Sequence, residues 1–222
     1  MHVPLSRIQK IIGERMLKSK LSKPCFYLEL KADVTELMAI RPKLRKSSGV
    51  KITTNAFYIH SLGLAAQEYP LVLGRFDENG IGIAERINVG FAVNAPQGLV
   101  VPVVKDAGKK TLADIAREER LLTDKARDNQ LTLEDIEGET IALSNLGAYG
   151  TDSFFGIVPP QTSTILAVGN VVPTVIYKND EITVRKMLRL SLAADRRVIN
   201  ETYAARFLGF IKEKLQNPQQ LM

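Results

Sequence analysis

Few side chains in this sequence could act as a base or a nucleophile near neutral pH. The histidines are His2 and His60, and the one cysteine is Cys25. His60 falls in an apolar stretch with helical spacing, where we expect a structural or surface role. Cys25 stands at the start of an expected strand, where a small buried hydrophobe is its ordinary role and a redox or acyl-carrying role is the alternative. The residues thus offer no obvious general base, and we expect no metal site.

The composition excludes several classes of protein. The chain has 222 residues, of which 45% are hydrophobic and 24% charged, as in ordinary globular proteins. No apolar run approaches the roughly 20 residues that span a membrane, and no signal segment opens the chain. A lone cysteine fits a reducing compartment, so we expect the cytoplasm, or the mitochondrial matrix if the source is eukaryotic.

The net charge of +6 admits two interpretations. The basic residues are spread along the chain and do not cluster as in a nucleic-acid patch, so we expect no nucleic-acid partner. A solvated basic face is one interpretation, and a phosphate-bearing cofactor is the other.

Helical and strand patterns alternate along a chain without repeats or linkers, which predicts a single domain over residues 1–222. Helices are predicted for 6–17, 34–45, 53–69, 111–127 and 201–215, with Asp33 and Asn200 as caps. Strands are predicted for 26–32, 87–95, 99–104, 140–143, 164–172, 175–177 and 182–193, and a hairpin for 71–84. Several strands are joined by hairpins, which favours an α/β fold with a mixed sheet flanked by helices.

Four stretches, in register along the whole chain, resemble one family. They are R-I-x-x-x-I-x-x-R-M-x-x-S-K from residue 7, G-L-V-V-P-V-V from 98, T-I-A-L-S-N-L-G from 140 with P-P-Q at 159, and D-R-R-V-I-N-E from 195. Together they resemble the catalytic core domain of the dihydrolipoyl acyltransferase component of 2-oxo-acid dehydrogenase complexes. No lipoyl or peripheral-subunit-binding segment is visible in this chain.

The resemblance implies a fold related to chloramphenicol acetyltransferase and a homotrimer with each active site between subunits. Coenzyme A or acyl-coenzyme A, and a dihydrolipoyl group from another domain or chain, would enter a channel from opposite ends. Trimers of this family build 24- or 60-subunit cores through an apolar C-terminal tail. Leu221 and Met222 are candidates for that anchor, and a frayed terminus is the alternative.

The sequence departs from the family at its base. The family motif D-H-R-x-x-D-G reads D-R-R-V-I-N-E here, so Arg196 stands at the histidine position and Asn200 at the second aspartate position. Arginine cannot act as a base, because its pKa exceeds about 12. Asp195 and Arg197, on either side of Arg196, match the family and are expected to support the site.

Other family positions are retained or compensated. Ser144 matches the family's oxyanion donor, with Asn145 and Gly147 beside it, and a turn serine is the alternative role. Arg15 matches an arginine that could pair with the missing aspartate, and Glu201 could replace that carboxylate. The family often has a lysine at the position of His60, which predicts an outward side chain.

Three functions remain open at this point. An oligomeric scaffold with absent or reduced acyl transfer fits the loss of the base. An active acyltransferase would use Ser144 and activate the thiol without histidine, for instance by the charge of Arg196. An antibiotic-acetylating enzyme of the related fold is the third. The expected partners are copies of this chain, other components of the complex, or a histidine-bearing paralogue.

Overall fold

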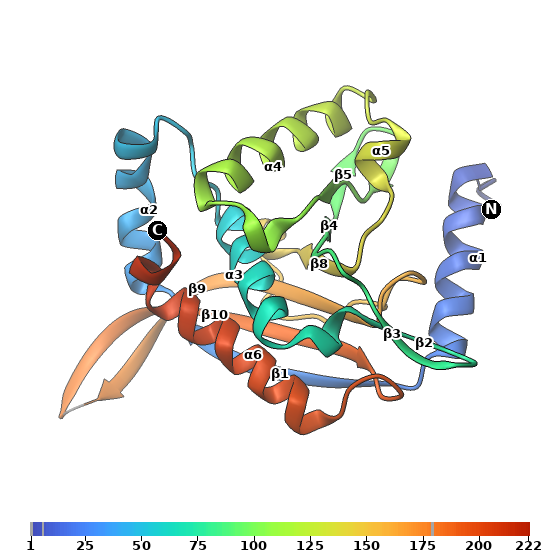
Figure 1. The fold of residues 1–222 in the computed structure, drawn as a ribbon. Helices are drawn as coiled ribbons and strands as arrows, with labels where there is room; N and C mark the ends of the chain where they lie inside the picture. The colour runs from blue at the N-terminus through green and yellow to red at the C-terminus, as the bar shows by residue number, and fades with distance from the viewer. Residues whose placement is uncertain (1, 6, 179) are drawn as a thin grey trace.

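A mixed six-stranded sheet forms the centre of the chain in the computed structural model, which describes residues 2–5, 7–178 and 180–222 (Figure 1). The strand order is β1-β10-β9-β8-β4-β7. These strands are β1 (Cys25–Asp33), β4 (Val89–Phe91), β7 (Val103–Val104), β8 (Ile141–Asn145), β9 (Thr164–Lys178) and β10 (Glu181–Asp195). β8 runs parallel to both β4 and β9, whereas the remaining pairs are antiparallel. The predicted mixed sheet is confirmed.

Two small ribbons lie outside this sheet. They are β2 (Gly74–Asp77) with β3 (Gly80–Ile83), and β5 (Val93–Ala95) with β6 (Gly98–Val100). The hairpin predicted for 71–84 is confirmed over β2 and β3, but its first three residues belong instead to a 3-10 turn, Pro70–Leu73. Pro70 explains the difference, because proline has no N–H for a strand ladder and fits the first turn of a helix.

Helices cover one face of the sheet and its ends (Figure 1). They are α1 (Arg7–Ser22), α2 (Thr35–Ser48), α3 (Thr54–Glu68), α4 (Leu112–Arg127), the short α5 (Leu133–Ile136) and α6 (Glu201–Gln216). Thr53, Thr111 and Asn200 cap α3, α4 and α6 by accepting a backbone N–H. α3 is buried on nearly all sides, as its composition predicts. No helix in the described part of the chain is long and apolar enough to cross a membrane.

The helix predicted for 6–17 continues to Ser22 as α1, although its predicted first residue, Ser6, lies outside the described residues. Two contacts tie its end to a loop near β9: Ser19 Oγ donates to the Val158 carbonyl (2.6 Å), and Lys23 Nζ donates to the Thr162 carbonyl (2.7 Å). The rest of α1 stands apart from the helices on the sheet (Figure 1). Its exposed leucines, Leu17 and Leu21, are 60% and 78% exposed.

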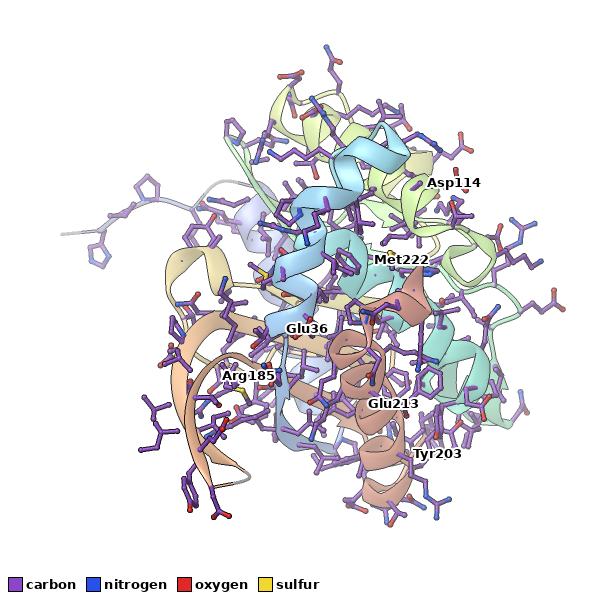
Figure 2. The ribbon with its side chains drawn as sticks, turned by 90° about the vertical axis from the view of Figure 1, so that its left-hand side faces the viewer. Glu36, Asp114, Arg185, Tyr203, Glu213 and Met222 are labelled. Carbon is purple, nitrogen blue, oxygen red and sulfur yellow. The ribbon has the colours of Figure 1, made fainter. Side chains whose placement is uncertain are left out.

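β9 and β10 form a long hairpin that projects well past the rest of the sheet (Figure 1). Its turn was predicted at Asn179-Asp180, and Asn179 lies outside the described residues. At the base of the hairpin, Arg185 Nε is 2.7 Å from Asp33 Oδ2 and its Nη2 is 4.0 Å from Glu36 Oε1 (Figure 2). Beyond this point, the four side chains Val175, Tyr177, Ile182 and Val184 are each 65–76% exposed.

His60 contradicts the prediction of an outward side chain. It is 8% exposed, and its Nδ1 has no hydrogen-bond partner among the described residues. α3 lies between α4, α6 and the sheet, so almost every side of it is internal. Burial lowers the pKa of His60, because desolvation disfavours the charged ring.

Candidate functional site

Ser144 lies within β8, one residue before the strand ends. It is half-buried and aligns with Ala167 on β9, which in turn aligns with Ser191 on β10. The structure thus gives Ser144 a strand position and not the turn position that was the alternative. The turn follows immediately, as the 3-10 segment Gly147–Tyr149.

Arg196 lies just past the end of β10, where its backbone N–H donates to the Pro24 carbonyl (3.0 Å). Its side chain turns to solvent, with Nε 2.9 Å from Glu201 Oε1, and both side chains are more than half exposed. The guanidinium therefore carries a fixed positive charge and already has a carboxylate partner.

Asp195 and Arg197 form a much less exposed pair on either side of Arg196. Arg197 donates to both oxygens of Asp195, through Nε (3.0 Å) and Nη2 (2.7 Å), and the Asp195 side chain is 3% exposed. Hydrogen bonding to Asp195 raises the pKa of Arg197 further. The Arg197 guanidinium also lies 4.7 Å from the centre of the Phe76 ring. The pair fixes the turn that carries Arg196.

Asn200 caps α6: its Oδ1 accepts the N–H of Tyr203 (2.9 Å). The expected compensation between Glu201 and Arg15 is not seen, because Glu201 pairs with Arg196. Arg15 lies on α1 and is exposed, so within one chain it is not a buried cation in need of a carboxylate. A role of Arg15 at a boundary between copies stays a prediction.

Ser144 and Arg196 are too far apart to act together within one chain. Two strand spacings separate Ser144 from Ser191, and five residues along β10 separate Ser191 from Arg196. With about 4.8 Å between strands and about 3.3 Å per residue, the two positions lie on the order of 20 Å apart. A site using both requires two copies of the chain.

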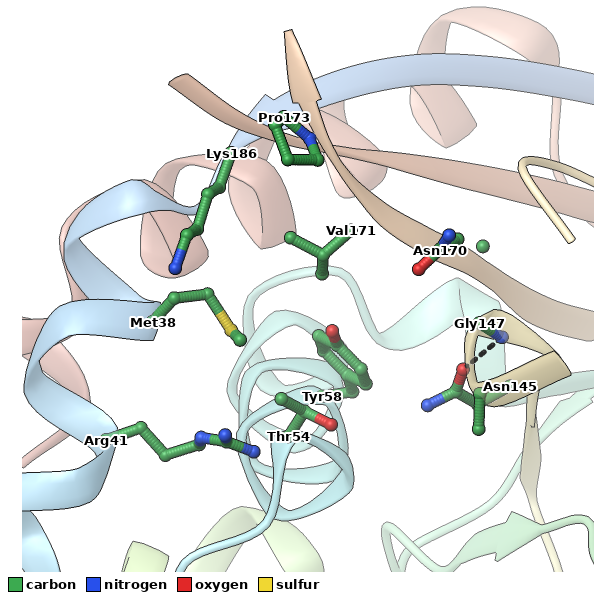
Figure 3. Close-up of a pocket in the computed structure, with 12 residues that line it drawn as sticks. Met38, Arg41, Thr54, Tyr58, Asn145, Gly147, Asn170, Val171, Pro173 and Lys186 are labelled. Atoms are coloured by element: carbon green, nitrogen blue, oxygen red, sulfur yellow. Dashed lines mark hydrogen bonds between the residues drawn. The ribbon is translucent and has the colours of Figure 1, made fainter. Parts of the chain in front are cut away.

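An open cavity of about 390 Å³ lies beside the turn that follows Ser144 (Figure 3). Asn145 and Gly147 line one side, and Met38 and Arg41 of α2 line the other, with Thr54 and Tyr58 of α3 between them. Lys186 and Pro173, paired across the base of the hairpin, close a further side. Two cations, Arg41 and Lys186, therefore border a partly apolar cavity.

Over residues 1–222 the chain matches the family model described as 2-oxoacid dehydrogenases acyltransferase (catalytic domain). The chain belongs to this acyltransferase family. One relative, the dihydrolipoyllysine-residue acetyltransferase component of the pyruvate dehydrogenase complex of Rickettsia felis, is 36% identical over 220 residues, covering 97% of this chain and 53% of that protein. The mouse mitochondrial pyruvate dehydrogenase protein X component is 30% identical, covering 99% and 44%. The chain spans about half the length of the curated relatives it matches.

Solved structures support the same family. The dihydrolipoamide acetyltransferase of Azotobacter vinelandii gives a TM-score of 0.94 at 29% identity, covering 100% of this chain and 93% of that one. A cubic core of the pyruvate dehydrogenase multienzyme complex gives the same values. Chloramphenicol acetyltransferase, at 15% identity, a TM-score of 0.52 and 92% of each chain, shows the shared fold alone.

The Azotobacter enzyme was studied for the roles of a serine, a histidine and an asparagine in its catalytic mechanism. Its histidine follows its serine at the same separation as Arg196 follows Ser144, and its asparagine follows at the same separation as Asn200 follows Arg196. An acyltransferase of this family thus has asparagine where the sequence interpretation expected aspartate. The departure at Arg196 remains.

Cys25 and the C-terminal residues were also predicted to have particular roles. Cys25 is half-buried against a small apolar cluster that is separate from the main core. Burial raises the pKa of its thiol, so it is a poor nucleophile. Leu221 is 2% exposed and packs into the main core of its own chain, which removes it from the expected anchor. Met222 is 65% exposed, and the anchor remains a prediction for it alone (Figure 2).

Sequence reasoning missed the cavity residues Arg41, Tyr58 and Lys186. They come from α2, α3 and β10, and no motif links them. Tyr58 is 2% exposed, and burial raises its pKa to about 12. Lys186 follows Arg185 in a predicted strand, so no sequence signal sets it apart, and only the fold joins it to Arg41. Among the described residues, no group of three or more His, Cys, Asp or Glu side chains could hold a metal ion.

Proposed function

We propose that this chain is the core of an acyltransferase-like protein of a 2-oxo-acid dehydrogenase complex, and that it acts mainly as an oligomeric scaffold with absent or reduced acyl transfer. One observation carries the proposal: a solvent-exposed arginine, paired with Glu201, occupies the position of the histidine.

The reaction of the family explains why this position matters. A thiol of coenzyme A or of a dihydrolipoyl group attacks a thioester carbonyl, and a thiol with a pKa of about 8.5 is only partly ionised at neutral pH. A general base contributes typically about 10² to 10⁴ in rate. Arg196 cannot accept the proton, and the buried His60 lies in α3 with little access to solvent. Transfer by the parent chain should therefore be slow.

The scaffold requires association of copies, which two observations support. The candidate residues Ser144 and Arg196 can meet only across a boundary between copies. The outer part of the β9–β10 hairpin presents Val175 opposite Val184 and Tyr177 opposite Ile182, so the four exposed side chains share one face. We call this the apolar arm face. A homotrimer, with growth to a larger core, accounts for both observations.

Coenzyme A is the ligand that best fits the cavity beside the turn after Ser144. Its phosphates require cations, and Arg41 and Lys186 border the opening, while Met38, Val171 and Pro173 suit the apolar parts of its pantetheine arm. The dihydrolipoyl group would come from another domain or another chain.

An active acyltransferase is the second candidate. Ser144 and the neighbouring turn are in place, and asparagine at position 200 also occurs in the Azotobacter enzyme. The positive charge of Arg196 could lower the pKa of a thiol brought to it across a subunit boundary. Such an enzyme would lack the limb of a pH–rate profile that histidine produces near pH 6.5.

The deciding measurement is acetyl transfer from acetyl-coenzyme A to dihydrolipoamide across pH. The parent is compared with Arg196→His and with Arg196→His plus Asn200→Asp, and Arg196→Gln serves as the control that removes the charge without adding a base. We expect a slow parent, a gain of about 10² or more in the histidine variants, and no gain in Arg196→Gln. A parent that turns over as fast as the histidine variants contradicts the scaffold, and a loss of rate in Arg196→Gln assigns the activation to the guanidinium.

A further inference from the structure

Glu119 is a buried carboxylate that the proposed chemistry does not use. It lies on α4 and is 5% exposed. In the described part of the chain, no cation lies within 4.0 Å of the Glu119 carboxylate. The more distant Arg127 favours its charged form only through a long-range electrostatic interaction. Burial raises the pKa of Glu119. An unpaired buried carboxylate is costly unless hydrogen bonds satisfy it, so its surroundings need an explanation.

Neutral donors surround this carboxylate and lead from it to the cavity. Thr53 Oγ1 donates to Glu119 Oε2 (3.0 Å). The side chains of Asn55 and Thr123 lie near this carboxylate and oppose the rise of its pKa that burial causes. Asn55 Oδ1 in turn accepts Asn145 Nδ2 at 2.7 Å. Asn145 Oδ1 then accepts the backbone N–H of Gly147 at 2.9 Å (Figure 3).

Asn55 and Asn145 form a chain of two amides between Glu119 and Gly147, and Glu119 determines which way each amide is oriented. An ionised carboxylate can only accept hydrogen bonds, whereas an asparagine amide both donates and accepts. Asn55 must therefore turn its NH₂ to Glu119 and its carbonyl to the next residue. Asn145 follows the same order and points its carbonyl at the N–H of Gly147. Reversal of either amide would place two donors or two acceptors against each other.

The end of the chain of amides is a wall of the cavity. Asn145 and Gly147 line it directly after Ser144, and Thr54 and Tyr58, on the helix that carries Asn55, line the adjacent side. Gly147 packs so closely on β9 that a Cβ there would collide with the carbonyl of Gly169. The turn is thus held from one side by β9 and from the other by the amide of Asn145.

We propose that Glu119 is a positioning residue of the acyl-coenzyme A cavity, which fixes the turn after Ser144 through Asn55 and Asn145. Glu119 itself never touches the ligand. The identity of the ligand rests on the function proposed above, whereas the ordering of the turn does not.

The test first disrupts the contact between Glu119 and Asn55 and then restores it with the carboxylate at position 55 and the amide at position 119. Glu119→Leu removes the acceptor, and Asn55→Asp places a second acceptor against it, so both variants break the order of donors. Asn55→Asp combined with Glu119→Gln restores the order, because the amide introduced at position 119 would donate to the carboxylate introduced at position 55, which still accepts from Asn145. Glu118→Gln, on the same helix but in a pair with Lys110, is the matched control.

Two readouts separate the two proposals. The first is hydrogen exchange of the Gly147 amide, which we expect to be about five- to tenfold faster in both single variants, consistent with the loss of one hydrogen bond, and near the parent rate in the double variant and the control. The second is the affinity for coenzyme A by calorimetry, expected to fall and recover in the same order.

Unchanged exchange in both single variants, or a double variant that does not recover, overturns the positioning role. Faster exchange with an unchanged affinity also overturns it, because the turn would then not serve the ligand. If the parent itself binds no coenzyme A, the proposed ligand is wrong, and the exchange of Gly147 alone decides whether Glu119 orders the turn.

Discussion

At position 196 the chain carries a permanent cation where the related Azotobacter enzyme has a histidine, a group that can gain and lose a proton. The pair with Glu201 is exposed, and exposed pairs contribute only about 0–1 kcal/mol to stability. Arg196 is therefore not explained by a need of the fold. The local frame around it is retained, because Asp195 and Arg197 still fix the turn. The turn that carries residue 196 thus keeps its geometry, whereas the side chain at this one position can no longer accept a proton.

His60 leads to a prediction about pH and stability. Its pKa is lowered by burial, so below pH of about 6.5 the unfolded chain binds a proton that the folded chain excludes. The free energy of unfolding should therefore fall as the pH falls from about 6.5 toward the lowered pKa. In His60→Leu this loss should be smaller, as measured by urea unfolding at pH 7.5 and pH 5.

His2 provides the control for this experiment, because it is exposed. His2→Ala should retain the pH dependence of the parent. If His60→Leu and the parent lose the same free energy between the two pH values, the assignment to His60 is incorrect.

Among the elements, α6 shows how one position can serve structure and chemistry together. Asn200 ends the turn that begins at Asp195 and caps the helix through Tyr203. Asparagine and aspartate are about equally good caps, so either residue keeps the helix start in place. The asparagine at the corresponding position of the Azotobacter enzyme is consistent with this structural role.

The cap gives a quantitative prediction. Asn200→Ala should lower the free energy of unfolding by about 1 kcal/mol, because the N–H of Tyr203 loses its acceptor, whereas Asn200→Asp should stay close to the parent. Chemical denaturation at pH 7 measures both. Equal stability of all three proteins would show that the hydrogen bond to Tyr203 contributes nothing.

The elements also show where sequence reasoning succeeds. Periodicity located α3 and α4, and periodicity with the predicted cap Asn200 located α6, each to within about a residue or two. β9 was divided at Pro173, because proline interrupts most strands. In the structure β8 ends opposite Val168, so farther along β9 has a free edge, and an edge strand tolerates proline. That depends on the length of a neighbour, which no local pattern contains.

For the molecule as a whole, the motifs predicted the fold but not the cavity. Ser144 and Arg196 were found through the family, whereas the cavity joins α2, α3, β8, β9 and β10, whose contacts follow only from packing. The buried Glu119 gave no signal either, because a glutamate within a charged helix is ordinarily exposed. The residues that escape prediction are therefore those whose neighbours in the structure lie far away in the sequence.

The apolar arm face gives a prediction about assembly. Tyr177→Ser combined with Ile182→Ser should lower the mass of the particle measured by light scattering after gel filtration, because apolar area that copies bury together is lost. Leu133→Ser is the control, because Leu133 is 70% exposed but lies on α5, away from the arm. An unchanged mass for the arm variant, or an equal drop for the control, contradicts a role of this face.

The distance of about 20 Å between Ser144 and Arg196 has a genetic consequence. In a trimer each copy would give its serine to one boundary and its arginine to the other. Beside a histidine-bearing chain, Ser144 would then face an intact base, and that boundary could turn over although this chain alone could not. Each boundary at which the partner chain supplies the histidine would be active, whatever the other two boundaries contain. Activity would therefore rise in proportion to the dose of the partner gene. Loss of Ser144 from this chain would not be complemented in this way, because at its other boundary the chain contributes Arg196 and no base.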